Sequence, residues 1–552
     1  MLTLNIVNDP WLPVLRRSGS RSVIAPWQIT DGFDDDPITA LTLPRPDLSL
    51  AVTELLIGLL QTLAAPEDAD TWFDALAAPP APEQLRERFG RHADAFELGG
   101  AGPRFMQDLD ATLEQRLDKR PVDALLINAP GEQTLKQNTD LFVKRGQVAG
   151  LSPALAAATL YTWQAYGPGR GRGHLTSLRG RGPLTTLVVG DPQAGAASLW
   201  ENLWLNVLPA ADFLGDWRGG HAAEDLFAWM CPTRTSEEGT GGVRTPEDTH
   251  PAHVYWAMPE RIRLCLDETD LATGEGHCDL SGEPCALRIT HFVAGTYGNK
   301  YTGAWRHPLS SYYRKASGEM LPRHPQPGGI GYRHWLALAA GPGSAAGGAP
   351  AKVVDRFIRE RDPGEQRRLR AAGYDMDKAA ARGWYDAELP VYGFRGMQPQ
   401  PFHEHIQQLI EGAEFVAQAL RAAAKTAWFG GATVRGDLSH IERQFWERTE
   451  AAFYRELDEA AHGSAAQAFD AEYRDQSRVR WHRVITEAAL AIFDQQVADG
   501  LIDAAPRRVA LAQGELRGKL FRGELPDKIL PLPKPRKNGA AAQRGQAEEE
   551  RA

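Results

Sequence analysis

Residues 410–427 read IEGAEFVAQALRAAAKTA. The apolar and small side chains in this stretch recur every three or four positions, which is the spacing that lines one face of an α-helix. They are Ile410, Ala413, Val416, Ala417, Leu420, Ala424 and Ala427. The stretch therefore predicts an amphipathic helix that buries one face against a partner.

The residues that follow repeat this pattern. A second stripe holds Leu438, Ile441, Phe445, Ala452 and Phe453, a third holds Trp481, Val484, Ile485, Ala488, Ala489, Ile492 and Phe493, and a fourth holds Ala510, Leu511, Leu516, Leu520 and Phe521. Successive amphipathic helices with short connections favour an antiparallel bundle. We expect a four-helix bundle at residues 400–522.

Upstream of the bundle, residues 1–390 mix short β-like runs, helices and glycine-rich loops. Ile6-Val7 and Trp11–Val14 indicate an early strand. Asp47 is a helix cap, and the apolar window after it, Leu48–Leu63, is interrupted by polar residues. This window is too short and too polar to span a membrane, so it predicts a core helix.

Further elements follow in the same region. The sequence predicts a helix at Pro153–Trp163 and a strand at Leu184–Val189, which is rich in β-branched residues. Two more strands, Arg261–Leu266 and Ala286–Thr290, bracket a turn-rich stretch as a pair. The fold class is therefore α+β: a large mixed α/β N-terminal domain with long Gly/Pro-rich loops, followed by the helical bundle.

Length and composition agree with this organisation. A chain of 552 residues is expected to form two or three domains. Residues 523–552 are basic and then polar, and we expect a disordered tail there. Four cysteines favour a reducing cytoplasm over a disulfide framework. The net charge of −10 excludes a protein that coats nucleic acid by itself, so any such contact must be local.

Motifs of enzyme chemistry are not apparent. Gly514–Leu520 imitates a phosphate-binding loop, but its glycine spacing is short and no Ser or Thr follows Lys519. His403 and His405 lack the spacing that places two imidazoles on one helical face. We therefore expect no enzyme activity and no cofactor.

The segment 167–182 reads GPGRGRGHLTSLRGRG. Glycines let a backbone approach a groove or a phosphate closely, and the four arginines at 170, 172, 179 and 181 add charge for DNA contacts. A flexible surface loop with incidental arginines is the alternative. The concentration of both residue types in an acidic chain favours nucleic-acid binding.

Two other stretches carry candidate sites. Gly274–Cys285 contains His277, Cys278 and Cys285, which with Cys265 could ligate zinc; a metal-free hairpin is the favoured alternative. In Leu135–Arg145, Phe142, Lys144 and Arg145 could clamp a nucleic-acid backbone or a partner subunit, or could form a solvated edge around one buried phenylalanine.

Several motifs in order resemble the CasA family, the large subunits of type I-E CRISPR Cascade complexes. They are Asp9–Val14 (DPWLPV), Leu43–Asp47 (LPRPD), Pro103–Gln107 (PRFMQ), Ile127–Gly131 (INAPG), the glycine-rich segment through Thr186 (LRGRGPLTT at its end), Trp305–Pro308 and Gly373-Tyr374. The resemblance covers roughly residues 5–520, and it includes a C-terminal helical bundle.

The resemblance implies a function. Such a subunit sits in a complex of crRNA-containing Cascade subunits, recognises the protospacer-adjacent motif in double-stranded target DNA, starts strand separation and recruits a helicase–nuclease. A cytoplasmic location and no membrane association follow. The alternatives are a structural scaffold that binds partner proteins without reading DNA, and a metal-dependent nuclease, which would need an acidic cluster that the sequence does not show.

The resemblance also implies roles for particular residues. The glycine loop that reads the DNA motif corresponds to Gly167, Gly169, Arg170, Gly171, Arg172 and Gly173. The family's minor-groove lysine finger falls on His277, with Lys300 or a neighbouring residue as a substitute cation. The strand-separating wedge falls on Lys378 and Ala379. Asn128 falls on the loop near the guide RNA handle and the DNA motif.

Overall fold

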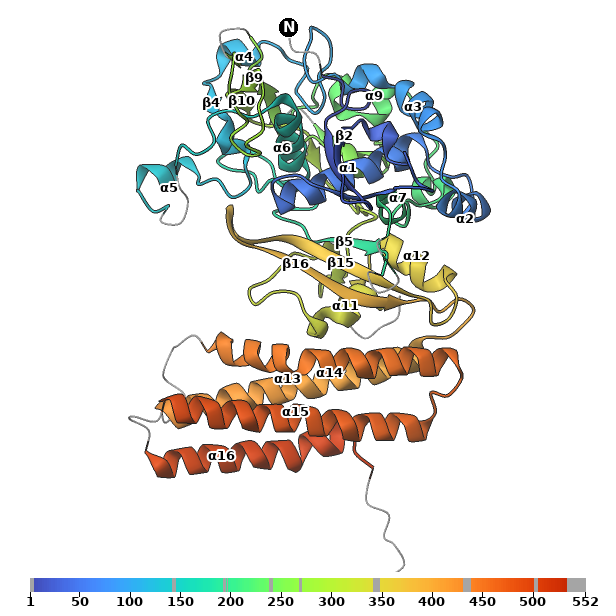
Figure 1. The fold of residues 1–552 in the computed structure, drawn as a ribbon. Helices are drawn as coiled ribbons and strands as arrows, with labels where there is room; N and C mark the ends of the chain where they lie inside the picture. The colour runs from blue at the N-terminus through green and yellow to red at the C-terminus, as the bar shows by residue number, and fades with distance from the viewer. Residues whose placement is uncertain are drawn as a thin grey trace, which may run out of the picture. The chain divides into compact units, whose positions relative to one another are not determined.

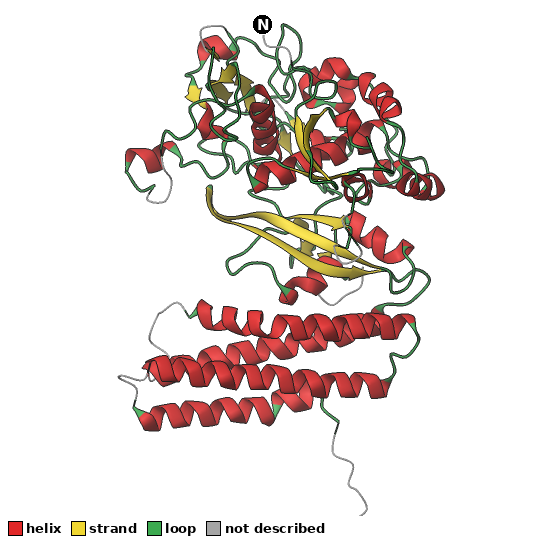
Figure 2. Cartoon of the chain, in the orientation of Figure 1, coloured by secondary structure: helices red, strands yellow, loops and turns green. Residues whose placement is uncertain are grey.

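The computed structural model describes residues 4–140, 145–191, 195, 197–237, 242–267, 271–340, 348–429, 438–500 and 505–533 (Figure 1). The chain divides into two compact units. Unit 1 comprises Met1–Ile330 and Ala337–Arg395, and unit 2 comprises Gly331–Leu336 and Gly396–Ala552. The fold is mixed helix and sheet with a C-terminal helical region, which confirms the predicted α+β class (Figure 2).

Helix α1, Pro46–Leu63, is the central helix of unit 1. Asp47 lies in its first turn, where a carboxylate interacts favourably with the helix dipole. Of the described helices, it alone is long and apolar enough to cross a membrane, yet 72% of its apolar window is buried inside the protein. It is a core helix, as predicted. Helix α6, Pro153–Tyr166, packs against it.

The remaining elements of unit 1 are short, and long loops connect them (Figure 2). Its other helices are α2 Ala69–Ala77, α3 Pro82–Gly90, α4 Leu113–Arg116, α5 Glu132–Lys136, α7 Leu199–Trp204, α8 Ala210–Leu214, α9 Ala223–Leu226, α10 His253–Trp256 and α12 Lys352–Glu360, and α11 Trp335–Ala339 begins in unit 2. Its strands are β1 Leu12–Arg16, β2 Arg21–Ile24, β3 Ile38–Leu41, β4 Arg120–Pro121, β5 Thr185–Val189, β6 Val243–Arg244, β7 Arg261–Leu264, β8 Leu271–Thr273, β9 Leu287–Ile289, β10 His291–Gly295, β11 Lys300–Tyr301, β12 Tyr312–Arg314, β13 Met320–Pro322, β14 Gly348–Ala349, β15 Gln366–Asp377 and β16 Ala380–Tyr392.

Two strand predictions need correction. Ile6 and Val7 lie in a buried turn, and the first strand starts only at Leu12. The strands predicted at 261–266 and 286–290 form as β7 and β9, but they do not pair with each other. Instead β7 pairs with β10, and β9 pairs with β8. Alternation of apolar residues identifies strands, but it does not identify their partners.

The longest strands of unit 1 form a hairpin, β15 and β16, which joins β5 in a three-stranded antiparallel sheet of order β16-β15-β5 (Figure 1). Ala372 of β15 lies opposite Thr185 of β5, and Asp377 lies opposite Ala380 at the far end of the hairpin. One end of this hairpin is therefore fixed in the sheet with β5, while its tip extends beyond it.

Unit 2 is an antiparallel bundle of four long helices (Figure 2). They are α13 Gln400–Phe429, α14 Ser439–Ala465, α15 Ala471–Gly500 and α16 Pro506–Phe521. The predicted stripe on α13 is buried throughout. On α16 the prediction is partly wrong, because Leu511 and Phe521 are 60% and 48% exposed and Ala512 is buried in their place.

Two further segments belong to the bundle. Tyr332 stacks on Phe453 with ring centroids 4.4 Å apart, so Gly331–Leu336 joins unit 2 although the predicted boundary at 390 places it in the first domain. The described part of the tail that was expected to be disordered is instead folded. Leu525–Ile529 forms a π-helical turn, and Leu525 and Leu530 are fully buried, since they pack against the helices. Residues beyond 533 lie outside the described residues.

Candidate nucleic-acid interface

The glycine-rich segment 167–182 begins where helix α6 ends. The N–H of Gly167 donates to the carbonyl of Trp163 at 2.8 Å and closes the last helical turn. A Cβ at Gly167 would lie 2.3 Å from that same oxygen, so no larger residue fits without a shift of the backbone. The N–H of Ser177 then donates back to the carbonyl of Gly167 at 3.1 Å, which closes the segment into a loop.

The tip of this loop presents bare backbone. Gly169, Gly171 and Gly173 all have positive φ angles, of +63°, +93° and +84°. At Gly169 a Cβ would also lie 2.8 Å from the backbone of Leu175. Both the positive φ and this close approach therefore require glycine at this position. Gly171 and Arg172 are exposed. The exposed tip is therefore the bare backbone of Gly171 with one cation, Arg172, beside it.

Arg170 turns inward and holds the loop in place. Its guanidinium stacks over the ring of Trp163 at 5.0 Å and donates to the carbonyl of Ile127 at 2.7 Å. Burial lowers the pKa of Arg170 to about 10, which still leaves it protonated at neutral pH. The hydrogen bond connects the glycine loop to the residue before Asn128. Two of the predicted site segments are thereby brought together.

Asn128 is tied in turn to the start of α1 and to β15. The Oδ1 of Asn128 accepts from Nη2 of Arg45 at 2.9 Å, and the same guanidinium forms an ion pair with Asp47 at 2.9 Å. The hydroxyl of Tyr374 donates to Asp47 Oδ2 at 2.7 Å. Three motifs that lie far apart in the sequence thus meet in one cluster, Arg45–Asp47–Asn128–Tyr374. Arg45 was not among the predicted site residues. The prediction that Asp47 caps α1 is wrong, because Arg45 is the N-cap residue and Asp47 lies within the first turn.

Lys378 and Ala379 form the two-residue turn at the tip of the β15–β16 hairpin. Lys378 is exposed and adopts a φ of +55°, which is uncommon for a residue with a side chain. The two residues that the resemblance assigns to the wedge thus occupy a hairpin turn. The tip is an exposed corner that carries Lys378, on two long antiparallel strands whose pairing shifts register between Asp375 and Met376.

The glycine-rich segment and the hairpin are in direct contact. Gly182 packs so closely on β15 that a Cβ there would lie 2.6 Å from Cγ of Met376 and 2.9 Å from the carbonyl oxygen of Tyr374. On the same strand, a Cβ at Gly373 would lie 2.5 Å from the carbonyl oxygen of Pro183. The end of the glycine-rich segment therefore lies against the hairpin two residues before its turn.

Arg179 has a structural role that the sequence did not predict. It is buried, and its guanidinium donates two hydrogen bonds, of 2.7 and 2.8 Å, to the buried carboxylate of Glu54 on α1. Burial by itself would raise the pKa of Glu54, but Arg179 and His307 outweigh that effect and hold the pKa at about 2. The expectation that Arg179 contacts DNA is wrong, because the pair instead anchors the segment to the core.

His277 lies on a hairpin near the opposite end of α6. A β-bridge joins His277 to Pro284, and Asp279 accepts from the N–H groups of Ala149 and Gly150 just before the helix. Helix α6 has 14 residues, so at 1.5 Å per residue this anchor is about 20 Å from the glycine loop. His277 is exposed, but this anchor does not place it beside the loop.

The two cysteines of this hairpin are free thiols. Cys278 is buried and Cys285 is partly exposed. Burial would raise the pKa of Cys278, but hydrogen bonds from backbone N–H groups at Ser152, Ser281 and Leu280 outweigh it and lower the pKa. Over the described ranges, no three His, Cys, Asp or Glu side chains are grouped so that they could hold a metal ion.

The remaining predicted site residues lie in the loop after α5. Phe142 and Lys144 fall outside the described residues. Arg145 is described, and its guanidinium donates to both carboxylate oxygens of Asp140, at 2.5 and 2.6 Å, and to Oδ1 of Asn138 at 3.0 Å. Arg145 is therefore paired within its own stretch of the chain, with Asn138 and Asp140.

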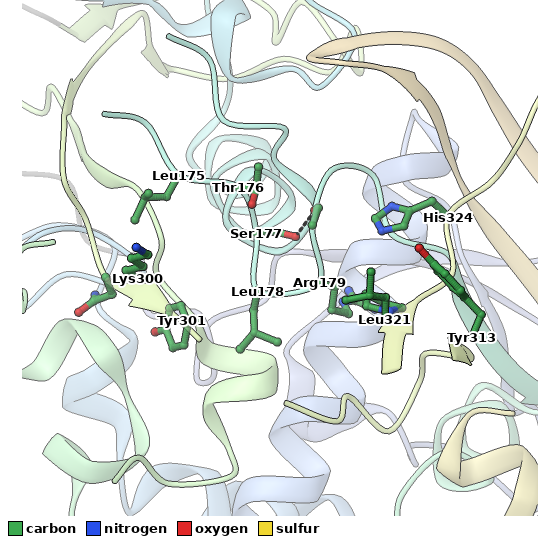
Figure 3. A pocket seen from close by; sticks show the side chains of 13 residues that line it. Leu175, Thr176, Ser177, Leu178, Arg179, Lys300, Tyr301, Tyr313, Leu321 and His324 are labelled. Atoms are coloured by element: carbon green, nitrogen blue, oxygen red, sulfur yellow. Dashed lines mark hydrogen bonds between the residues drawn. The ribbon is translucent and has the colours of Figure 1, made fainter. Parts of the chain in front are cut away.

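A cavity of about 430 Å³ opens beside the glycine-rich segment. Residues 175–180 line one wall, and Lys300 and Tyr301 of β11 line another. The third wall comes from β12, β13 and His324. Figure 3 shows Lys300 and Tyr301 on one side of the 175–179 backbone and His324, Tyr313 and Leu321 on the other. Lys300, the substitute cation named from the sequence, thus lies at the same segment.

Comparison with known proteins identifies relatives. The family model of CRISPR-associated protein Cse1 matches residues 5–492. The solved structure of Thermobifida fusca Cse1 superposes with a TM-score of 0.68 at 20% identity, covering 96% of this chain and 98% of that one. Thermus thermophilus CasA gives a TM-score of 0.67 at 19% identity, with 94% and 99% coverage.

A chain in a structure described as a CRISPR RNA-guided surveillance complex is equally similar. Its TM-score is 0.67 at 18% identity, and the match covers 95% of this chain and 100% of that chain. These likenesses show that the fold is shared over both units.

Proposed function

Because this chain belongs to the CRISPR-associated Cse1 family, we propose that it is the large subunit of an RNA-guided Cascade complex. Its partners are the subunits that hold the crRNA, the double-stranded target DNA and a helicase–nuclease effector. The match over residues 5–492 and the likeness to a chain of a surveillance complex support this assignment. We further propose a cytoplasmic location and no catalytic step of its own.

In this proposal the glycine loop reads the protospacer-adjacent motif. Bare backbone at Gly171 can enter a minor groove because no Cβ intervenes, and Arg172 and Lys300 supply charge for the phosphates. The minor groove distinguishes base pairs poorly, so this loop would tolerate several motif sequences. Guide pairing then checks the target sequence itself.

Strand separation is assigned to the hairpin tip. Unstacking one base step costs a few kcal/mol, and an exposed corner inserted at that step offsets the cost by holding the strands apart. Lys378 can additionally pair with a phosphate of either strand. The rigid part of the wedge is the paired length of β15 and β16 behind the turn.

The observation that carries the proposal is the contact between the two segments. Gly182 lies against Met376, two residues before the turn at 378–379, and its N–H donates at 3.2 Å to the carbonyl of Tyr166, the residue before the glycine loop. A protein that reads a motif and opens the adjoining base pair needs its reading loop and its wedge at neighbouring positions. Arg45 and Asn128 add a link to the loop assigned to the guide RNA handle.

The test is a gel-shift comparison of motif-bearing and motif-free duplexes with the reconstituted complex. We expect the wild type to prefer the motif, and Gly169→Asp and Lys378→Ala to weaken binding of the motif-bearing duplex while leaving assembly intact. A control is Arg91→Ala, which removes only an exposed i,i+4 ion pair.

Three outcomes would contradict the proposal. Equal affinity of the wild type for both duplexes would remove the reading role. Assembly defects from the same substitutions would support a scaffold that binds only partner proteins. Magnesium-dependent cleavage of DNA by the purified chain would show a nuclease instead.

A further inference from the structure

The cavity at residues 175–180 has a lining suited to a planar, partly apolar group. Leu175, Leu178 and Leu321 contribute aliphatic surface, and Tyr313 contributes a ring that is 36% exposed. Its volume of about 430 Å³ is large enough for a single nucleotide and falls in the range of small-molecule sites. Aromatic and aliphatic walls of this kind are what an unstacked base contacts in single-strand-binding proteins.

Charge around the cavity favours an anion. Many arginines of unit 1 face a carboxylate, as Arg263 faces Glu114 at 2.6 Å. By contrast, Lys300 on the wall and Arg323 behind Tyr313 form no ion pair with any carboxylate in the described ranges. Of these two cations Lys300 is exposed on the cavity wall, so in a chain of net charge −10 it is an attractive site for a phosphate.

Arg323 also fixes the ring that a base would stack on. Its guanidinium lies over the ring of Tyr313 at 5.9 Å, and its Nε is buried without a hydrogen-bond partner among the described residues. Burial lowers the pKa of Arg323, and among the residues that the structure describes no carboxylate offsets the desolvation.

The cavity also lies close to the wedge. The Nδ1–H of His324, on the cavity wall, donates to the carbonyl of Arg181 at 2.9 Å, and the His324 ring packs on the backbone of Gly180. Gly182, which follows Arg181 in the chain, touches Met376 of the hairpin. One short run of backbone therefore forms the cavity wall and supports the strand that carries Lys378.

From these observations we propose that the cavity receives one unpaired nucleotide when the duplex opens. The base stacks on Tyr313 against Leu178 and Leu321, and Lys300 neutralises the phosphate. This inference rests on the proposed function, since it names where a nucleotide goes once the hairpin tip has separated its pair. Occupancy would stabilise the opened state and so favour the start of guide pairing.

The test uses the reconstituted complex and duplexes with a permanent bubble next to the motif, so that unpairing costs the same in every sample. An abasic nucleotide is placed at successive positions in each DNA strand, and in a third series in the 5′ handle of the guide. Leu321→Trp fills the cavity, and Lys300→Gln removes its cation. The matched control is Leu511→Trp, at an exposed position of the bundle.

At one position in one strand, we expect the abasic nucleotide to weaken wild-type binding about ten-fold, the size of one base–aromatic stacking interaction. Leu321→Trp should weaken binding of the intact strand by a similar factor and should abolish the abasic effect at that position. The DNA strand that shows this coupling supplies the nucleotide, whereas coupling in the guide handle alone would contradict the inference.

The inference is overturned if the abasic effect and the Leu321→Trp effect multiply independently at every position of both DNA strands. It is also overturned if Leu321→Trp binds as tightly as Leu511→Trp. Both results are interpreted only if the wild-type complex binds the motif-bearing duplex more tightly than the motif-free duplex. If that preference is absent from the wild type, the proposed function itself fails instead.

Discussion

Glu54 is ionised although it is buried, because Arg179 donates to both of its carboxylate oxygens and Nε2 of His307 lies 3.3 Å from one of them. Leu309 donates its N–H to Nδ1 of His307, so the neutral ring carries its proton on Nε2, facing Glu54. Burial and the charge of Arg179 lower the pKa of His307 to about 4, so it stays neutral near pH 7. The Glu54–Arg179 ion pair therefore anchors the glycine-rich segment to helix α1.

We predict that Glu54→Gln destabilises unit 1 by about 3–5 kcal/mol, because it leaves the Arg179 guanidinium buried without a counter-charge. Urea unfolding of the full chain, followed by tryptophan fluorescence, would measure this change. In the control, Glu87→Gln breaks an ion pair whose side chains are 65% and 74% exposed, and it should cost less than about 1 kcal/mol. A loss below 1 kcal/mol for Glu54→Gln would contradict the buried-pair interpretation.

The sequence carried part of this information. Glu54 interrupts an otherwise apolar helical window, and a buried carboxylate requires a cation or several hydrogen bonds. However, nothing in the sequence indicates which of the four arginines at 170, 172, 179 and 181 pairs with the Glu54 carboxylate. Charge indicates that an arginine needs a partner, and only the fold decides whether that partner is a carboxylate or DNA.

Among the elements, the β15–β16 hairpin shows most clearly what sequence patterns miss. The resemblance located its turn at Lys378, but no strand was predicted on either side, because Gln366–Asp377 is rich in arginine. Those charges are paired across the strands, as Arg370 donates to Asp386 at 2.9 and 2.6 Å. Cross-strand ion pairs of this kind stabilise a solvated sheet face without an apolar alternation.

At the same scale, Arg45 connects the hairpin to the loop that carries Asn128. We predict that Arg45→Met increases amide hydrogen exchange at residues 126–131 and 373–377 by about ten-fold. The substitution keeps the apolar length of the side chain, but it removes the bonds to Asn128, Asp47 and Tyr374. Hydrogen-exchange mass spectrometry of the full chain would measure it.

The control for this prediction is Arg382→Met. That arginine pairs with Asp375 inside the hairpin, at 2.6 Å, and has no bond to the 127–131 loop among the described residues. It should change exchange in the hairpin alone. If Arg45→Met leaves exchange at 126–131 unchanged, the cluster does not couple the two segments.

On the scale of the whole molecule, burial of histidine makes both units sensitive to acid. Burial lowers the pKa of His253 in unit 1 to about 3, and it lowers the pKa values of His403 and His405 in unit 2 to about 4 and 3. Unfolded histidine has a pKa near 6.5. Protons therefore bind the unfolded chain first, and stability is lost as the pH falls from about 6.5 towards 4.

The bundle offers the cleaner test, because His405 lies in its core with Nε2 3.0 Å from Oγ of Ser477, whose hydroxyl donates to Glu456 at 2.7 Å. Between pH 7 and pH 5 we expect each buried histidine to cost roughly 2 kcal/mol of stability. His405→Gln keeps an amide in reach of Ser477 but cannot be protonated. It should therefore reduce the pH dependence of hydrogen exchange in α13 by about that amount, while His462→Gln, at an exposed position of α14, should not. An unchanged pH dependence in His405→Gln would mean that the imidazole is protonated within the folded bundle, and the packing around Ser477 would then have to hold a charge.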